Sequence, residues 1–241
     1  MRVPWPPGFP PAFVHGAWNG ANGCLKDHAD WAAAKTEADE EAAIRIVRET
    51  MQEAMLEGIF DACVAEGERP PLVVAPALTL AERSNALAIA YGTELAFEMG
   101  WEYADRIFQV KTIKRDQRKT WFRLKNQPQF CGYVEPGRRY VLVDDVLTMG
   151  GTLASLRGFI ENQGGVVICM SALAGGNAGG RTRISLAPPT LLRLTDAHDG
   201  RLRDLVRKEI GFGIDCLTEP EGQFLLARPS YDACRKGLHG A

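Results

Sequence analysis

The chain has 241 residues, of which 46% are hydrophobic and 24% are charged, and its formal net charge is -2. This length supports one substantial core, and the small net charge excludes a global field that would draw the protein to nucleic acid or to an anionic membrane. The six cysteines show no paired spacing, and no apolar run approaches the ~20 residues that cross a bilayer. We therefore expect no zinc site, disulfide framework or membrane partner, and we predict a cytoplasmic protein.

The composition changes along the chain and suggests three parts of one compact unit. Residues 1–28 are rich in proline and glycine, and we predict an arm without a regular hydrogen-bond ladder. Residues 29–180 form the predicted core, which begins with one or two amphipathic helices between residues 29 and 65. Residues 181–241 are predicted to form a helical hood or extension, with short helices at 202–210, 219–227 and 231–238.

The core alternates short apolar runs with helical patterns. Strands are predicted at 72–75, 104–110, 140–143 and 166–170, and helices at 83–99 and 153–162. This order indicates an α/β fold with a doubly wound, mostly parallel sheet, in which ligands bind beyond the carboxyl ends of the strands. The polar connection 111–136 is too long for an ordinary loop, which indicates a functional or disordered segment.

One segment carries a clear chemical pattern. Two acids, Asp144 and Asp145, follow the apolar run 140–143, and a turn then leads into a helix through Thr148, Met149, Gly150, Gly151 and Thr152. Glycines allow the backbone amides of such a turn to face a phosphate at the positive end of the helix. Adjacent carboxylates can hold ribose hydroxyls directly or through Mg²⁺. The pattern predicts a site for a phosphorylated ribose.

This segment resembles the signature of type I phosphoribosyltransferases, which bind 5-phosphoribosyl-1-pyrophosphate (PRPP). The resemblance implies a transferase fold, Mg²⁺ as cofactor, and Asp144 and Asp145 as catalytic and metal-binding residues, through water or the ribose hydroxyls. Residues 148–152 would hold the 5-phosphate; Met149 departs slightly from the family pattern. It further implies a loop after the first strand for pyrophosphate, with Ala77, Leu78 and Arg83, and a flexible loop whose Lys111, Lys114 and Arg115 meet the leaving group.

Further segments, at 25–35, 134–140 and 211–221, look like those of bacterial phosphoribosyltransferase-like proteins with no settled substrate. Thr148 stands where hypoxanthine and guanine enzymes usually carry an aspartate, so that specificity is not expected. The acceptor base is left open. The family also implies a homodimer, for which we expect the exposed apolar helix at 42–59 to offer a contact.

Other interpretations of the same residues stay open. Arg83 can be a solvated helix residue, and the basic loop can be a solvated stretch or a contact for nucleic acid, although nucleic acid is not the expected partner. The main alternative to an enzyme is a non-catalytic regulatory module that binds PRPP or a nucleotide. A third possibility is the modification of a larger nucleic-acid or peptide substrate.

Overall fold

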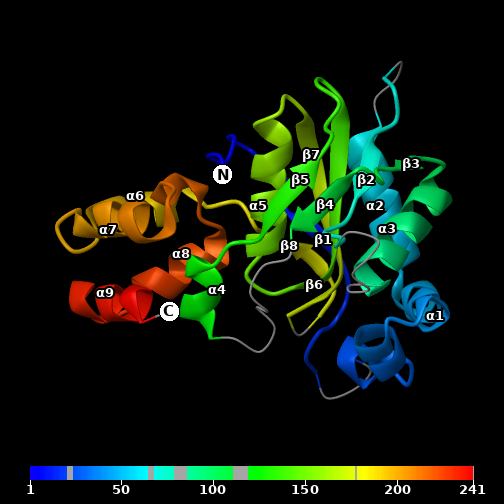
Figure 1. Ribbon diagram of the computed structural model, residues 1–241, viewed down its shortest axis with the longest axis horizontal. Coiled ribbons are helices and arrows are strands. Elements are labelled where there is room, and N and C mark those ends of the chain that lie inside the picture. Colours follow the sequence, from blue (N-terminus) through cyan, green and yellow to red (C-terminus); the bar gives the residue numbers. More distant parts are fainter. Residues whose placement is uncertain (21–23, 65–67, 79–85, 111–118, 177, 241) are drawn as a thin grey trace.

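The computed structural model describes residues 1–20, 24–64, 68–78, 86–110, 119–176 and 178–240. Within these residues the main sheet has six strands in the order β3-β2-β6-β7-β1-β8, and only β8 runs antiparallel to its neighbour. The strands are β1 Ala12–Gly16, β2 Leu72–Val74, β3 Glu102–Tyr103, β6 Arg139–Leu147, β7 Val166–Gly175 and β8 Gly180–Thr182. This architecture, with helices on both faces (Figure 1), confirms the predicted α/β fold.

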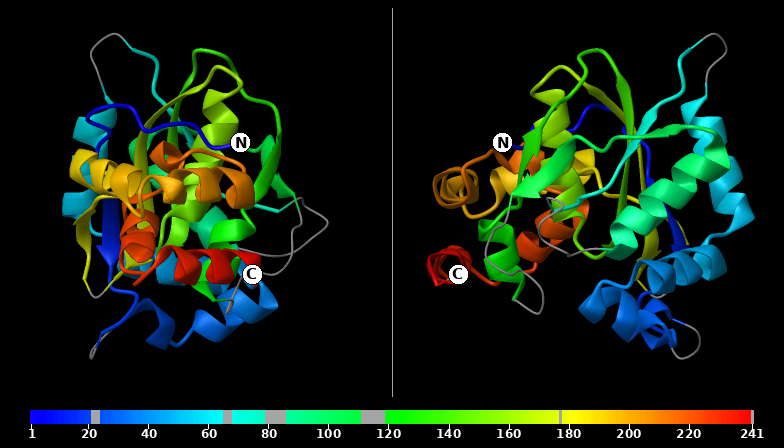
Figure 2. Two further views of the ribbon diagram at one scale, coloured as in Figure 1. Left: turned by 90° about the vertical axis from the view of Figure 1, so that its left-hand side faces the viewer. Right: turned by 45° about the vertical axis from the view of Figure 1, so that its right-hand side comes forward.

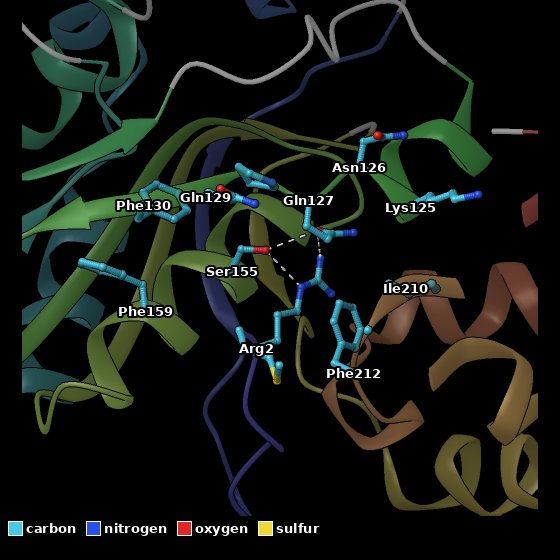
Figure 3. A pocket seen from close by; sticks show the side chains of 13 residues that line it. Arg2, Lys125, Asn126, Gln127, Gln129, Phe130, Ser155, Phe159, Ile210 and Phe212 are labelled. Atoms are coloured by element: carbon cyan, nitrogen blue, oxygen red, sulfur yellow. Dashed lines mark hydrogen bonds between the residues drawn. The ribbon is translucent and has the colours of Figure 1, made fainter. Parts of the chain in front are cut away.

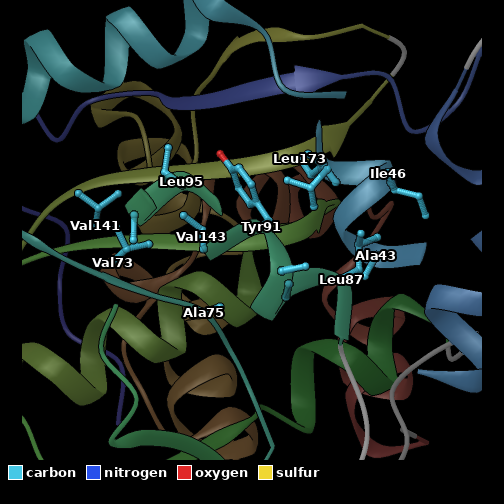
Figure 4. Close-up of a cluster of buried hydrophobic side chains, with 14 of the residues drawn as sticks. Ala43, Ile46, Val73, Ala75, Leu87, Tyr91, Leu95, Val141, Val143 and Leu173 are labelled. Atoms are coloured by element: carbon cyan, nitrogen blue, oxygen red, sulfur yellow. The ribbon is translucent and has the colours of Figure 1, made fainter. Parts of the chain in front are cut away.

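One face of the sheet is covered by the helices α1 Glu40–Thr50, α2 Glu53–Cys63 and α3 Ala86–Met99. Their buried side chains meet alternate residues of the strands, such as Val141 and Val143 of β6 (Figure 4). The side chain of Asp39 accepts a hydrogen bond from the amide of Ala42, so it caps α1 just before two glutamates in the first helical turn. The predicted amphipathic helices between residues 29 and 65 are therefore confirmed.

The opposite face is covered by α5 Gly151–Glu161, which buries Leu153, Leu156 and Ile160 against the other set of strand side chains. A small antiparallel sheet, formed by β4 Ile107–Val110 and β5 Gln129–Gly132, lies next to α5. Because β6 is buried on both faces, its apolar residues form a continuous run and do not alternate with polar ones.

The C-terminal part has its own core. It contains α6 Pro188–Asp196, α7 Arg201–Ile210, α8 Glu219–Leu226 and α9 Tyr231–His239, together with the short helix α4 Thr120–Lys125 from the middle of the chain. Figures 1 and 2 show these helices gathered beside the sheet, away from α1–α3. The three C-terminal helices predicted from the sequence are confirmed; α6 was not predicted.

The predicted N-terminal arm is wrong for Ala12–Gly16, which forms the strand β1. This strand pairs with both β7 and β8, and Phe13 lies opposite Ser171 and Arg181. The segment begins directly after Pro11, so all of its residues keep the amide donors that a sheet requires. Phe13 and Val14 are buried, which supplies the apolar burial that stabilises a strand inside the sheet.

The predicted second strand at 104–110 also needs correction. The strand that extends the parallel sheet beyond β2 is Glu102–Tyr103, whereas Ile107–Val110 pairs antiparallel with β5. The described end of the long connection 111–136 is ordered as α4 and β5. The two apolar runs at 140–143 and 166–170 are strands, but each continues further, to Leu147 and Gly175.

The apolar stripe at 42–59 was expected to be exposed, and this is wrong for part of the stripe. Ala42, Ile46 and Ile59 are fully buried against the sheet and α3. These buried residues stabilise the fold, whereas Ile44, Met51, Met55 and Leu56 of the same segment are only partly buried. The oligomeric state itself stays a prediction.

Candidate functional site

The candidate site lies where the winding of the sheet reverses. From β2 the chain continues to α3 and β3 at one edge, and from the adjacent β6 it continues to α5 and β7 in the other direction. The ends of β2 and β6 therefore diverge into loops on opposite faces, which creates a crevice in sheets of this kind. The loop after β6 is the predicted phosphate turn, and the loop after β2 is the predicted pyrophosphate loop.

The two acids lie inside β6 and not after it, which corrects the sequence-based expectation. Asp144 pairs in register with Ala172 of β7, and both carboxylates are largely buried. The Asp145 amide donates to Oδ1 of Asp144 (2.9 Å), and the Val146 amide donates to Oδ1 of Asp145 (2.8 Å). These bonds hold both side chains at the carboxyl end of the strand.

The apolar side chains of β6 contact the cores on both faces of the sheet. Val141 and Val143 face the core under α1–α3, and Leu142 faces the core under α5, as expected for a strand. Val146 packs against the α1–α3 core, and Leu147 packs against the α5 core. The pairing of β6 with β7 stays in register across the acids, from Val143 opposite Ser171 to Leu147 opposite Gly175, so the sheet holds both acids in regular strand positions.

Asp145 forms an ion pair with Lys35, which lies in a π-helical turn at Ala33–Glu37. Burial raises the pKa of Asp145, but the charge of Lys35 and its hydrogen bond outweigh burial and lower it. Burial and the neighbouring Asp145 carboxylate raise the pKa of Asp144 well above its ordinary value. The charge of the pair is thus concentrated on Asp145 and balanced by Lys35.

The phosphate turn follows β6 and leads into α5. Gly150 has a φ of 71°, a left-handed conformation that favours glycine, and a Cβ there would also lie 2.8 Å from Cγ2 of Ile184. Helix α5 begins at Gly151, and its first-turn amides have no partner inside the helix. Thr148 is exposed at the start of the turn. The geometry is that of an anion-binding turn at a helix N-terminus.

Two further parts of the chain hold this turn in place. Thr218, which begins α8, donates from its hydroxyl to the carbonyl of Met149 at 2.6 Å. Arg123 of α4 donates from Nη2 to Oγ1 of Thr148 at 2.9 Å. The C-terminal helical unit therefore contacts the turn at two points.

Arg2 anchors the first turn of α5 from the other side. Its guanidinium donates to the carboxylate of Glu221 through both Nη atoms (2.5 and 2.9 Å), to the carbonyl of Gly151 (3.0 Å), and to Gln127. A Cβ at Gly151 would lie 2.8 Å from both Arg2 Nη2 and Glu221 Oε1, which explains the glycine. Arg2 lines a cavity of about 760 Å³, and none of the residues that line it is a predicted site residue. Figure 3 shows Arg2 among these lining side chains.

The predicted pyrophosphate loop is only partly described. The amide of Ala77 donates to the carbonyl of Ala75 (2.9 Å), and its carbonyl accepts from the amide of Gln109 (2.6 Å). Leu78 is half-buried and bridges to Gln109. The predicted cations of this loop and of the flexible loop lie outside the described residues: Arg83, Lys111, Lys114 and Arg115. Their contacts with pyrophosphate therefore stay predictions.

The donor set fits Mg²⁺ that arrives with a phosphorylated ligand. In the described part of the chain no cluster of three or more histidine, cysteine or acidic side chains could hold a metal ion. Mg²⁺ is commonly held by one or two carboxylates together with substrate phosphates and water, and Asp144 and Asp145 would supply such a pair if the ion replaced Lys35 as the partner of Asp145. When bound, the ion would neutralise charge on the phosphates.

The sequence did not reveal three residues of this site: Lys35, Arg123 and Arg2. Lys35 and Arg123 lie far from the signature in the chain, on segments whose pattern indicates only a helix or a basic loop. Arg2 stands among prolines, where nothing indicates a buried guanidinium. The signal for all three is the tertiary contact itself.

The fold and site combine a mostly parallel α/β sheet with two buried carboxylates near the end of β6 and a glycine turn at the start of α5. No family model matches the chain. The chain is 33% identical over 243 residues to protein TraN of Escherichia coli. This match covers 100% of the chain and 51% of TraN. It is also 48% identical over 58 residues to adenine phosphoribosyltransferase of Corynebacterium efficiens, which is 24% of this chain and 30% of that enzyme. The chain thus spans about half the length of TraN.

Among solved structures, the chain is similar to an adenine phosphoribosyltransferase from Leishmania donovani. The match has 18% sequence identity and a TM-score of 0.36, and it covers 79% of this chain and 71% of that one. A second adenine phosphoribosyltransferase, from Thermoanaerobacter pseudethanolicus, matches with 20% identity and a TM-score of 0.33 over 58% of this chain and 71% of that one.

No helix in the described residues is long and apolar enough to cross a membrane.

Proposed function

We propose that the chain is a phosphoribosyltransferase that binds PRPP with Mg²⁺ and transfers ribose 5-phosphate to a nitrogenous base. The observation that carries the proposal is the combination, at the β2/β6 switch point, of a buried acidic pair with a glycine turn at the start of α5. The local 48% identity to an adenine phosphoribosyltransferase supports the same class.

In this proposal the ring nitrogen of the base attacks C1 of the ribose while the bond from C1 to the pyrophosphate oxygen breaks. Pyrophosphate leaves with the bonding electrons, and the nitrogen loses its proton to solvent when it carries one. Asp144 and Asp145 would hold the ribose hydroxyls and Mg²⁺, and residues 148–152 would hold the 5-phosphate. Positive charge from Arg83, Lys111, Lys114 and Arg115 stabilises the leaving group.

The test begins with calorimetric titration of PRPP into the protein, with and without Mg²⁺. We expect Mg²⁺-dependent binding that is lost in the double variant Asp144→Asn/Asp145→Asn. The exposed Asp105, which lies outside the site, supplies the matched control Asp105→Asn, and this variant should bind as the wild type does. A wild type that does not bind PRPP would refute the proposal.

Catalysis is tested separately by pyrophosphate release with a panel of bases, beginning with adenine. Asp145→Asn should lower turnover by more than about ten-fold, because removal of one transition-state contact commonly costs about 2–4 kcal/mol. Unchanged turnover in this variant would contradict the role of Asp145.

A specific observation favours the alternative of a non-catalytic regulatory module. The amide of Ala77 is bonded to Ala75 and is not turned toward a ligand, so the described part of this loop offers little to pyrophosphate. Such a module would bind Mg²⁺–PRPP but release no pyrophosphate with any base. A homodimer and a cytoplasmic location stay predictions of the family resemblance.

A further inference from the structure

We infer that Arg123 is a further phosphate-binding residue, which brings positive charge from the C-terminal helical unit to the 5-phosphate of the ribosyl ligand. This inference rests on the proposed function, because it concerns the same site. It assigns a role to a residue outside the signature and links the C-terminal helices to ligand recognition.

The contact that carries the inference is the hydrogen bond from Arg123 Nη2 to Thr148 Oγ1, at 2.9 Å. Thr148 is exposed at the entrance of the turn, and its hydroxyl keeps a proton of its own for a second acceptor. A phosphate oxygen beside this hydroxyl would therefore lie within reach of the guanidinium. Guanidinium groups bind phosphate oxygens in a bidentate manner, which adds both energy and orientation.

The turn itself carries no cation, so positive charge beside it comes from other parts of the fold. Residues 148–152 are Thr, Met, Gly, Gly and Thr, so they offer hydroxyls and amides but no positive charge. A phosphate monoester carries about -1.5 to -2 charges at neutral pH. Among the described residues, Arg2 contacts the carbonyl of Gly151, at the start of α5, and Arg123 contacts Thr148, at the entrance of the turn.

Arg123 is held in position by the docking of α4 on the C-terminal helices. Leu124 is buried in the C-terminal core, and the indole of Trp121 packs edge-on against Phe224 with ring centroids 4.7 Å apart. The side chain of Gln127 donates to the carbonyl of Arg123 at 3.1 Å and so closes the end of the helix. On the adjacent helix α9, Gly237 leaves room for Trp121, because a Cβ there would lie 2.2 Å from the indole.

The neighbouring cation on α4 is used differently. Lys125 donates to the carbonyl of Leu238 (2.9 Å) and pairs with Glu209 (3.6 Å), so it fastens α4 to the C-terminal helices. Arg123 contacts the phosphate turn, whereas Lys125 contacts the helical unit. This division of roles indicates that α4 connects the helical unit to the ligand site.

The test compares the binding of two ligands to the full chain by calorimetry: ribose 5-phosphate, and pyrophosphate with Mg²⁺. In Arg123→Gln the affinity for ribose 5-phosphate should fall by about 10- to 100-fold, as expected for charge-assisted hydrogen bonds. The affinity for pyrophosphate should not change, because that ligand occupies the other end of the site. Arg123→Lys should recover part of the loss, because lysine keeps the positive charge but lacks the planar, bidentate geometry of the guanidinium.

The matched control is Arg193→Gln, which removes an exposed arginine from α6 in the same helical unit. This variant should bind both ligands as the wild type does. Unchanged binding of ribose 5-phosphate in Arg123→Gln would overturn the inference and leave the proposed function intact. Equal losses for both ligands would assign Arg123 a merely structural role and would also overturn it. A wild type that binds neither PRPP nor ribose 5-phosphate would refute the proposed function and this inference together.

Discussion

The replacement of Arg2 by methionine should destabilise the whole protein, although Arg2 is only the second residue of the chain. Arg2 is 5% exposed and Glu221 is 2% exposed, and their side chains form a bidentate ion pair. In Arg2→Met the Glu221 carboxylate stays buried, with the Thr218 amide as its remaining described partner. The loss of one partner from a buried ion pair costs about 3–5 kcal/mol, because the other charge is left uncompensated.

Thermal unfolding, followed by circular dichroism, measures this loss. For chains of 150–250 residues each kcal/mol corresponds to about 2–4 °C, so we expect Tm to fall by about 6–20 °C. Arg2→Met/Glu221→Gln should recover part of the loss, because the buried charge is removed as well.

The matched control is Arg69→Met. Arg69 is exposed and pairs with Glu102 and Glu135 at the surface, so its replacement should cost less than about 1 kcal/mol. If Arg2→Met lowered Tm no more than Arg69→Met does, the assignment of Arg2 as the anchor of α5 and α8 would be wrong.

Three further changes test other parts of the structure. Burial lowers the pKa of His15 to about 4, so the folded protein resists protonation of this side chain. The free energy of unfolding should therefore fall by about 3 kcal/mol as the pH drops from 6.5 to 4. Urea unfolding should show this loss in the wild type, and an equal loss in His15→Gln would contradict the role of His15. Gly237→Ala should lower the free energy of unfolding by about 1–3 kcal/mol, because it forces a methyl group against Trp121, and it should weaken the binding of ribose 5-phosphate. Normal stability and binding would show that the docking of α4 does not depend on the close approach of Trp121 to Gly237. Thr218→Val should cost about 1–2 kcal/mol in urea unfolding through loss of the α8 cap and of the bond to Met149, and an unchanged midpoint would exclude that role.

The buried position of His15 illustrates why isolated histidines give little information in a sequence. Its Nδ1 accepts from the amide of Gln52 at 2.9 Å, which places the ring proton on Nε2, facing the hydroxyl of Tyr91 at 2.9 Å. The Tyr91 hydroxyl in turn lies 2.5 Å from that of Ser171. These residues come from four separate segments, so their polar network could not be read from spacing along the chain.

The apolar runs and the glycine turn could be read directly from the sequence. Strand β6 is apolar at every position from Val141 to Val143 because both of its faces are buried, and this makes a central parallel strand easy to recognise. The turn before α5 requires glycine at position 150 because of its left-handed backbone. Such local requirements leave a direct mark on the chain, so the strand, turn and helix could be predicted in order.

The strand β1 and the cations of the site were decided by tertiary structure. A five-residue strand after a proline-rich segment has a weak local signal, and its place in the sheet depends on pairing with residues more than 150 positions away. Lys35 meets Asp145, and Arg123 meets Thr148, only after the helices that carry them have docked. A charged side chain on a helix has the same local pattern whether it faces solvent or a binding site. The sequence by itself therefore determined the local geometry of the phosphate turn, and only the packing of distant helices decided which charges surround it.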